Sequence, residues 1–269
     1  MPDPIVIVKN LSKTFHLKTG FFGKGEPIRA VDQISFDISQ GEILGLVGES
    51  GSGKTTTGRI ILALEKPDSG NVSFREKEIF DMNKSELSKF RTEVQMIFQD
   101  PFSSLPPYMR IDSIIAEPLR VNHSHLSSEE LRRLVDECLS LVSLVPAEDY
   151  RYKHPSDLSG GQRQRVAIAR ALILSPSFIV ADEAVSMLDA SVRVGILNLL
   201  LDLRNKRGLS ILFITHDLGV AGYTCDRIAV MRHGKIVEIG PTAQILSFPS
   251  QDYTKQLLSA VPVLSALTT

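Results

Sequence analysis

Short apolar runs alternate with amphipathic segments along most of the chain. Predominantly apolar runs of the kind found in buried strands lie at residues 43–47, 94–98, 178–181 and 210–215. Segments with helical periodicity lie at residues 54–64, 162–174 and 191–204. Because buried strands that alternate with helices are typical of a largely parallel sheet, the pattern predicts an α/β fold.

Three regions depart from this alternation. Strand patterns at residues 5–8 and 36–38 flank residues 19–27, which are rich in glycine, end in proline and are predicted to form a surface loop. Residues 100–156 are mostly helical in pattern, so they predict an inserted lobe. Within this lobe Ser127 and Glu130 fit a capping box ahead of an amphipathic run. The last strand patterns, 228–231 with 235–238, predict a hairpin.

The most informative run is Gly-Glu-Ser-Gly-Ser-Gly-Lys-Thr-Thr at residues 48–56, between a predicted strand and a predicted helix. It fits the G-x-x-x-x-G-K-[ST] phosphate loop in the context that this loop requires. Backbone N–H groups and the helix N-terminus would bind phosphate, Lys54 can reach the β- and γ-phosphates, and Thr55 can offer a hydroxyl to Mg²⁺. The alternative is a Gly/Ser-rich turn that only joins strand to helix. Lys54 and Thr55 in register favour binding of a nucleoside triphosphate.

Polar residues end three of the predicted strands, where they would lie beside a phosphate loop. Asp182 can hold Mg²⁺ through water, and Glu183 is the predicted general base. His216 can donate a hydrogen bond to the γ-phosphate, and Gln99 can approach Mg²⁺ or the attacking water. Taken separately, each has a structural alternative: the two carboxylates could cap the next helix, and a histidine after a strand is more often structural.

The run Leu-Ser-Gly-Gly-Gln at residues 158–162 opens another predicted helix and makes a second anion-binding site. One nucleotide needs only one phosphate loop. We therefore predict that this second site closes over the γ-phosphate held by another subunit.

With these elements the chain resembles the ATP-binding cassette family over nearly its whole length. The matching motifs, in family order, are the phosphate loop, the glutamine loop at Gln99, the signature at 158–162, the acidic strand end at 182–183, the loop at 186–189 and the switch histidine His216. The resemblance implies one cassette domain, with a phosphate-loop core and an N-terminal antiparallel β part at residues 1–99 and 160–269. It also implies a helical signature subdomain at about residues 100–159.

The resemblance further implies a head-to-tail dimer that holds ATP and Mg²⁺ between the phosphate loop of one cassette and the signature of its partner. The implied catalytic residues are Glu183, His216 and Gln99, and the implied Mg²⁺ contacts are Thr55, Gln99 and Asp182. The implied nucleotide contacts are Phe15, Gly48, Glu49, Ser50, Gly51, Ser52, Gly53, Lys54, Thr55, Thr56, Ser159, Gly160, Gly161, Gln162 and Asp189.

One position departs from the family pattern, and another leaves alternatives open. Ala184 replaces the proline that usually follows the catalytic glutamate, so the strand exit is predicted to be less rigid. The aromatic that stacks on adenine is best matched by Phe15, with Phe21 or Phe22 left open.

Within the family the chain looks like the ATPase subunit of an importer for oligopeptides, dipeptides, nickel or oligosaccharides. The subfamily matches are residues 98–105, 154–155, 213–218, 238–241, 253–254 and 257–262. The implied partners are a second cassette, identical or homologous, two transmembrane permeases and, indirectly, a solute-binding protein. The permeases would dock along residues 99–110, where Phe102 and Tyr108 are candidate contacts. The alternative is a soluble subunit of an enzyme complex such as carbon–phosphorus lyase.

Charge, cysteine content and hydropathy narrow the location and the partners. The net charge of −1, from 30 basic and 31 acidic residues, disfavours nucleic acid as a partner. No run of about eighteen apolar residues and no signal peptide is found, so we expect a soluble, cytoplasmic chain. The resemblance to importer ATPases implies a peripheral position on the cytoplasmic face of the inner membrane. Cys138 and Cys225 are predicted to be small buried hydrophobes in a reducing compartment, and no iron–sulfur cluster is expected.

Overall fold

The computed structural model describes residues 3–19, 23–123 and 125–260. The chain forms two compact units, the first made of Met1–Leu87 with Ser210–Thr269 and the second of Ser88–Leu209. Phe21 and Phe22, the open alternatives for the adenine contact, and residues 265–269, predicted to be loosely held, lie outside the described residues. The helical subdomain predicted at about residues 100–159 lies within the second unit, and its limits stay a prediction.

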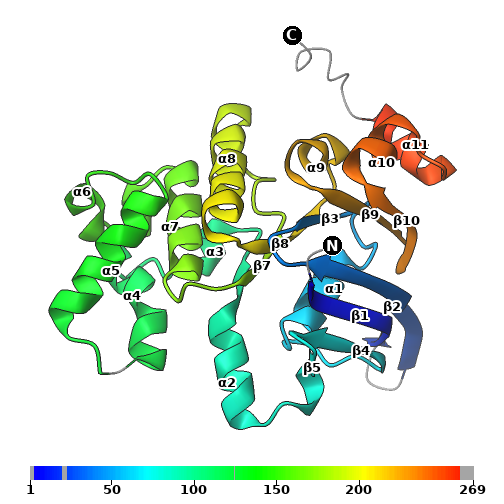
Figure 1. The fold of residues 1–269 in the computed structure, drawn as a ribbon, viewed down its shortest axis with the longest axis horizontal. Helices are drawn as coiled ribbons and strands as arrows, with labels where there is room; N and C mark the ends of the chain where they lie inside the picture. Colours follow the sequence, from blue (N-terminus) through cyan, green and yellow to red (C-terminus); the bar gives the residue numbers. More distant parts are fainter. Residues whose placement is uncertain (1–2, 20–22, 124, 261–269) are drawn as a thin grey trace. The chain divides into compact units, whose positions relative to one another are not determined.

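An antiparallel sheet opens the first unit (Figure 1). Its strands, in the order β2-β1-β4-β5, are β2 (Gly23–Ser39), β1 (Pro4–Thr19), β4 (Ser69–Phe74) and β5 (Lys77–Glu78). The predicted surface loop at 19–27 is therefore wrong over most of its length, because Thr19 pairs with Gly23 and His16 pairs with Pro27. Proline is tolerated there because β2 is an edge strand, where a missing N–H need not join the ladder.

The second sheet of the first unit carries the phosphate loop. Its strands, in the order β10-β9-β3-β8, are β10 (Lys235–Pro241), β9 (Arg227–Arg232), β3 (Ile43–Val47) and β8 (Ser210–Thr215). Strand β3 runs parallel to both β8 and β9, whereas β9 and β10 form the predicted antiparallel hairpin. Every residue of β3 and β8 is buried, as expected for the centre of a mostly parallel sheet.

Short helices complete the first unit. They are α1 (Lys54–Ile61), the 3₁₀ turn η1 (Ile79–Asp81), α9 (Leu218–Thr224), α10 (Thr242–Ser247) and α11 (Asp252–Ser259), while α2 (Lys84–Glu93) contains the boundary between the units. Helix α1 ends before the predicted residue 64 because Ala63 takes a left-handed backbone conformation, with φ of 54°. That conformation cannot continue a right-handed helix.

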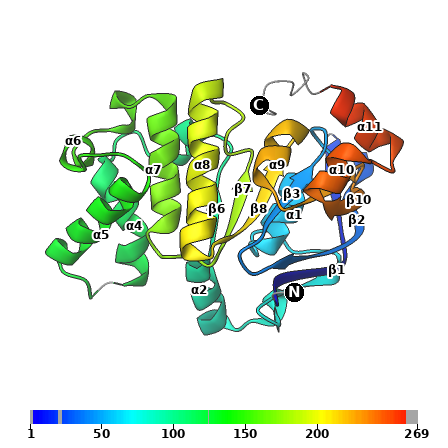
Figure 2. The ribbon, with the colours of Figure 1, turned by 45° about the horizontal axis from the view of Figure 1, so that its top comes forward.

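The second unit is mostly helical, as predicted. Strand β6 (Val94–Ile97) pairs in parallel with β7 (Phe178–Asp182). The helices are α3 (Pro101–Ser104), α4 (Ile111–Asn122), α5 (Ser128–Leu141), α6 (Glu148–Arg151), the 3₁₀ turn η2 (Pro155–Asp157), α7 (Gly160–Leu172) and α8 (Ala190–Arg207). Helices α7 and α8 lie side by side in both ribbon views (Figures 1 and 2).

The predicted capping box before α5 is confirmed. The Ser127 backbone N–H donates to Glu130 Oε2 over 2.8 Å, and the Glu130 N–H donates to Ser127 Oγ over 3.2 Å. These bonds satisfy two backbone donors that would otherwise lack partners at the helix start. The sequence signal was sufficient here because every part of the motif is local.

Both cysteines are free and buried, which confirms their interpretation as small apolar residues. Burial raises the pKa of the Cys138 thiol to about 11, and it raises the pKa of Cys225 as well. A Cβ atom at Gly45 of strand β3 would lie 2.9 Å from Cys225 Sγ. Glycine at this position therefore allows close packing of α9's C-terminal end on the sheet.

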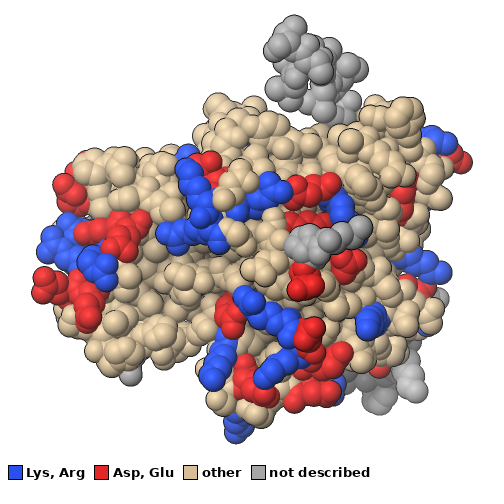
Figure 3. Space-filling model, in the orientation of Figure 1, with Lys and Arg blue, Asp and Glu red and all other residues tan. Residues whose placement is uncertain are grey.

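Charged side chains of both signs are interspersed on the face shown in Figure 3. This distribution agrees with the small net charge of −1 and offers no extended surface of one sign on that face. No helix within residues 3–19, 23–123 and 125–260 has the length and apolar character needed to cross a membrane.

Candidate nucleotide-binding site

The phosphate loop connects the buried strand β3 to α1, and two of its glycines are required by close packing. A Cβ atom at Gly48 would lie 2.1 Å from the Met231 carbonyl oxygen, and one at Gly53 would lie 2.0 Å from the Ala30 carbonyl oxygen. Gly51 has open space around it but a φ of +78°. It is therefore favoured by backbone conformation rather than by space.

The side chain of Lys54 folds back into the phosphate loop and is held there by hydrogen bonds. It is buried, and Nζ donates to the carbonyl oxygens of Gly48 over 2.7 Å and Glu49 over 2.8 Å, with Ser52 Oγ at 3.4 Å. The ammonium group is thus held at the start of α1, where the helix N-terminus also carries partial positive charge. Next to it, Thr55 is exposed, so its hydroxyl can meet a ligand.

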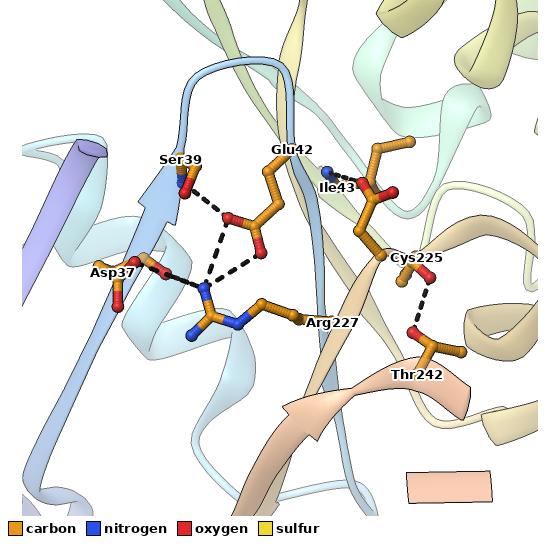
Figure 4. A network of polar contacts seen from close by, with 8 residues as sticks. Asp37, Ser39, Glu42, Ile43, Cys225, Arg227 and Thr242 are labelled. Carbon is orange, nitrogen blue, oxygen red and sulfur yellow. Dashed lines mark hydrogen bonds and ion pairs between the residues drawn. The ribbon is translucent and has the colours of Figure 1, made fainter. Parts of the chain in front are cut away.

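A charged network anchors the other end of β3 (Figure 4). The Glu42 carboxylate accepts hydrogen bonds from the Ser39 N–H over 2.7 Å and from Arg227 Nη1 over 3.2 Å, and the same guanidinium lies 3.4 Å from Asp37 Oδ2. Glu42 is only 7% exposed, so these partners satisfy carboxylate oxygens that water scarcely reaches. The network fixes the start of the strand that delivers the loop. Asp37, Ser39 and Glu42 are near neighbours in sequence, but no local pattern indicates the network, because Arg227 lies 185 positions from Glu42.

His216 follows β8, as predicted, and is exposed. The next residue, Asp217, caps α9 by accepting from the N–H groups of Gly219 over 2.8 Å and Val220 over 3.1 Å. This cap defines the turn from strand to helix on which His216 lies. The hydrogen bonds that Asp217 accepts thus fix the turn that carries His216.

Phe15 lies in β1, paired with Ile28 of β2. Its side chain is 38% exposed, and Lys13 Nζ lies 5.3 Å from the centre of its ring. A half-exposed ring on a sheet can stack on a flat base. The exposure of Phe15 is therefore compatible with the adenine contact.

In the second unit the structure brings Gln99 and Glu183 together. Gln99 Nε2 donates to Glu183 Oε2 over 2.9 Å, although the two residues are 84 positions apart. Sequence reasoning placed both at strand ends but did not predict this bond. The amide thus orients the carboxylate that was predicted to be the general base.

The backbone at Glu183 is unusual, because its φ of 46° lies in the left-handed region. Such a conformation in a residue other than glycine is strained and persists only where neighbours hold it. Here the Ser186 N–H and Oγ both donate to the Glu183 carbonyl oxygen, over 3.1 and 3.0 Å. The preceding Asp182 and the following Ala184 are buried, at 4% and 2% exposure. These bonds fix the strand exit although alanine replaces the usual proline.

The signature run forms the start of α7. Ser159 is the N-cap residue: its Oγ accepts from the Gln162 N–H over 3.3 Å, and its N–H donates to Gln162 Oε1 over 3.0 Å. A Cβ atom at Gly161 would lie 2.4 Å from Val192 Cγ1 of α8, so this glycine is required for the packing of α7 on α8. Gly160 has more room, with Leu188 Cδ2 at 4.0 Å from its added Cβ. Asp189, the N-cap residue of α8, is exposed.

The predicted Mg²⁺ ligands make a mixed set of oxygen donors. In the part of the chain that the structure describes, no group of three or more His, Cys, Asp or Glu side chains could hold a metal ion. The predicted ligands are the hydroxyl of Thr55, the amide of Gln99 and the carboxylate of Asp182, and they would leave the remaining coordination positions to phosphate oxygens. Mg²⁺ is usually bound in this way, by one or two carboxylates plus substrate phosphates, so the residues fit the ion.

The sequence patterns did not identify Tyr253 of α11 as a residue that contacts the phosphate loop. Its hydroxyl accepts a hydrogen bond from the Glu49 backbone N–H over 3.2 Å, across 204 positions of sequence. The sequence run around Tyr253 matched a subfamily pattern but carried no sign of contact with the phosphate loop. Only the fold could bring them together.

Comparisons with known proteins show which family and which proteins this chain resembles. A family model described as ABC transporter matches residues 31–186. The glutathione import ATP-binding protein GsiA of Escherichia coli strain K12 is 46% identical over 262 residues, which are 97% of this chain and 42% of GsiA. The chain thus spans less than half the length of GsiA. The oligopeptide transport ATP-binding protein OppF of Streptococcus mutans is 46% identical over 258 residues, 96% of this chain and 82% of OppF.

Solved structures confirm the predicted fold class. A dimeric ATP-binding cassette in a post-hydrolysis state, bound to ADP and Pi, matches with a TM-score of 0.77 and 34% identity, covering 88% of this chain and 98% of that one. The cbiO1 protein of Clostridium perfringens, part of an ABC transporter complex, matches with a TM-score of 0.76 and 28% identity over 90% of both chains.

Proposed function

Because the chain belongs to the ABC transporter family, we propose that it binds and hydrolyses ATP to power an importer of peptides or related solutes. The observation that carries this proposal is a phosphate loop folded around Lys54 in a chain that is 46% identical to OppF over 258 residues. The solute class includes dipeptides, oligopeptides, nickel and oligosaccharides.

ATP binding would use the phosphate loop, α1 and Phe15. The loop N–H groups and Lys54 contact the phosphates, and Phe15 stacks on adenine. Thr55, Gln99 and Asp182 would hold Mg²⁺, which would supply positive charge to balance the charge of the phosphate oxygens. The remaining chemistry falls to the side chains of the chain itself.

Glu183 is the general base of the proposed hydrolysis. Its carboxylate accepts a proton from the attacking water, while the hydrogen bond from Gln99 keeps it oriented. His216 donates a hydrogen bond to the γ-phosphate and helps to position the water. No covalent intermediate is needed, because positioning and charge stabilisation carry phosphoryl transfer to water.

Two cassettes would act together, head to tail. In this arrangement Ser159 and Gly161 contact ATP held by the phosphate loop of the second cassette, which is identical or homologous. The Ser159 oxygen accepts from Gln162, which leaves its hydroxyl proton available for donation to a phosphate oxygen. Asp189 belongs to the same interface. ATP between the cassettes draws them together, and hydrolysis lets them part.

The mechanical work would be delivered to two permeases at the cytoplasmic face of the inner membrane, with a solute-binding protein as an indirect partner. Residues 99–110 form the proposed docking segment. Tyr108 there is 81% exposed, so its ring is available to a partner, and Phe98 beside the segment is 45% exposed. The Phe102 side chain lies outside the described part of the structure and stays a prediction.

The Lys54→Ala protein is expected to lose ATP affinity and turnover together, because the β- and γ-phosphates lose a buried cationic partner. A hydrogen bond to a charged group contributes about 1.5–3 kcal/mol, so affinity should fall about 12- to 150-fold. Titration with ATP and Mg²⁺ measures this. The matched control is Lys77→Ala, which removes an exposed lysine paired with Glu86. Equal ATP affinity of Lys54→Ala and wild type would contradict the assignment of the loop.

Purification of the full-length protein from native membranes tests the importer assignment. Recovery with two permease subunits, identified by mass spectrometry, is the expected result. Recovery with soluble enzymes, such as those of carbon–phosphorus lyase, would favour the alternative complex and contradict the importer.

A further inference from the structure

Helix α11 reaches the phosphate loop through Tyr253. The Gly48–Glu49 peptide unit is held from both sides: its carbonyl oxygen accepts from Lys54 Nζ over 2.7 Å, and its N–H donates to Tyr253 Oη over 3.2 Å. Carbonyl and N–H of one trans peptide point in opposite directions in a common plane. The tyrosine therefore fixes the orientation of the peptide whose oxygen holds the lysine.

We propose that Tyr253 is a positioning residue, which sets the conformation of the phosphate loop and thereby of Lys54 for nucleotide binding. The proposal rests on the proposed function of this loop. Tyr253 itself would contact no phosphate. It would act by restricting the Gly48–Glu49 peptide before ATP arrives, so that less conformational freedom is lost on binding.

Tyr253 is well placed for this role because it is rigidly held. Its side chain is 5% exposed, and the Arg232 guanidinium lies 4.5 Å from the centre of its ring. Arg232 directly follows Met231, whose carbonyl oxygen packs where a side chain at Gly48 would lie. The end of β9 and the tyrosine thus meet the same first residues of the loop.

The helix that carries Tyr253 is anchored by Glu238 of β10. This carboxylate accepts from the Ser250 N–H over 2.7 Å, the Gln251 N–H over 3.2 Å and Thr254 Oγ1 over 2.5 Å. Burial opposes its ionisation, but these hydrogen bonds outweigh burial and lower the pKa of Glu238. Glu238 is therefore ionised at neutral pH, and α11 is fixed to the hairpin that flanks the loop.

The Tyr253→Phe protein provides the test. It keeps the buried ring and removes only the hydroxyl, so the fold is expected to persist. A net hydrogen bond of about 0.5–1.5 kcal/mol predicts that ATP affinity falls about 2- to 12-fold. The rate at saturating ATP should change by less than about twofold, because Glu183 and Gln99 are untouched. Residue-resolved amide exchange should show faster exchange at Glu49.

The matched control is Tyr150→Phe. Tyr150 is a half-buried tyrosine of the second unit, and Lys153 Nζ lies 4.9 Å from the centre of its ring. This variant should keep wild-type ATP affinity and wild-type exchange at Glu49. Thermal unfolding of both variants separates a change of stability from a change of affinity.

Each result decides the proposal. Weaker ATP binding together with faster exchange at Glu49 in Tyr253→Phe supports it. Unchanged ATP affinity, with or without a loss of thermal stability, would show a purely structural role and overturn it, as would unchanged exchange at Glu49. Wild-type protein that binds no ATP would contradict the proposed function and the positioning role with it, whereas a failure in Tyr253→Phe alone leaves the proposed function standing.

Discussion

Glu183→Gln protein is expected to bind ATP as tightly as wild type and to hydrolyse it about 10² to 10⁴ times more slowly, the usual loss for one positioned base. Glutamine has the same shape as glutamate, and its side-chain oxygen can still accept from Gln99 Nε2, which now lies 2.9 Å from Glu183 Oε2. The change therefore removes the proton acceptor while it preserves the contact that orients the side chain. ATP should then accumulate in a closed dimer.

ATP titration, single-turnover hydrolysis and size-exclusion chromatography in the presence of ATP measure these three effects. Glu148→Gln is the matched control, because it removes one carboxylate from an exposed position of the same unit. It should hydrolyse ATP at the wild-type rate. Near-normal turnover by Glu183→Gln would exclude Glu183 as the base.

The second large effect is expected from Ser159→Arg. ATP binding to the isolated chain should stay close to wild type, because the phosphate loop of that chain is unchanged. Dimer closure and hydrolysis should collapse, since a long cationic side chain would occupy the space proposed for the γ-phosphate of the partner's ATP. Ser159 is the better target than Gly161, because any side chain at Gly161 would collide with Val192 and disturb the packing of α7.

Two controls separate this effect from loss of the helix cap. Ser159→Ala removes the bond between Oγ and the Gln162 N–H, at a cost of about 1 kcal/mol in stability, without adding a cation. Ser156→Arg adds the same cation at a nearby exposed serine. Ser159→Arg should lose far more hydrolysis than either control.

Mixing two variants tests the head-to-tail arrangement. A dimer of one Ser159→Arg chain and one Lys54→Ala chain would hold one intact composite site and one site altered on both sides. Such mixtures should recover part of the activity that both pure variants lack, provided that one intact site suffices. Full hydrolysis by homogeneous Ser159→Arg protein would contradict the arrangement.

The parts of this fold that could be predicted depend on patterns of residues close together in sequence. The strands at 43–47 and 210–215 are predominantly apolar runs, and the capping box at Ser127 and Glu130 lies within four residues, so period and motif identify them. The loop predicted at 19–27 was wrong because glycine and proline mark edge strands as well as turns.

Parts of the site that depend on distant contacts could not be predicted. The bond between Gln99 and Glu183 and the bond between Glu49 and Tyr253 each join residues that only the fold brings together. The left-handed backbone at Glu183 was equally hidden, because glutamate carries no preference for that conformation. The residue types at the strand ends indicated the chemistry of the site, but their hydrogen-bond partners could be identified only in the folded structure.

The tight packing around Gly48 and Gly53 also bears on how inactive relatives of such proteins should be identified. A side chain at either glycine would bring its Cβ atom to 2.1 or 2.0 Å from a backbone oxygen, far inside van der Waals contact, whether or not a nucleotide is ever bound. A descendant that had lost catalysis would therefore still be selected to keep both glycines, simply to fold. Divergence at Glu183 or Lys54, where folding imposes no comparable steric demand, is the earlier sign that an enzyme of this kind has become a scaffold.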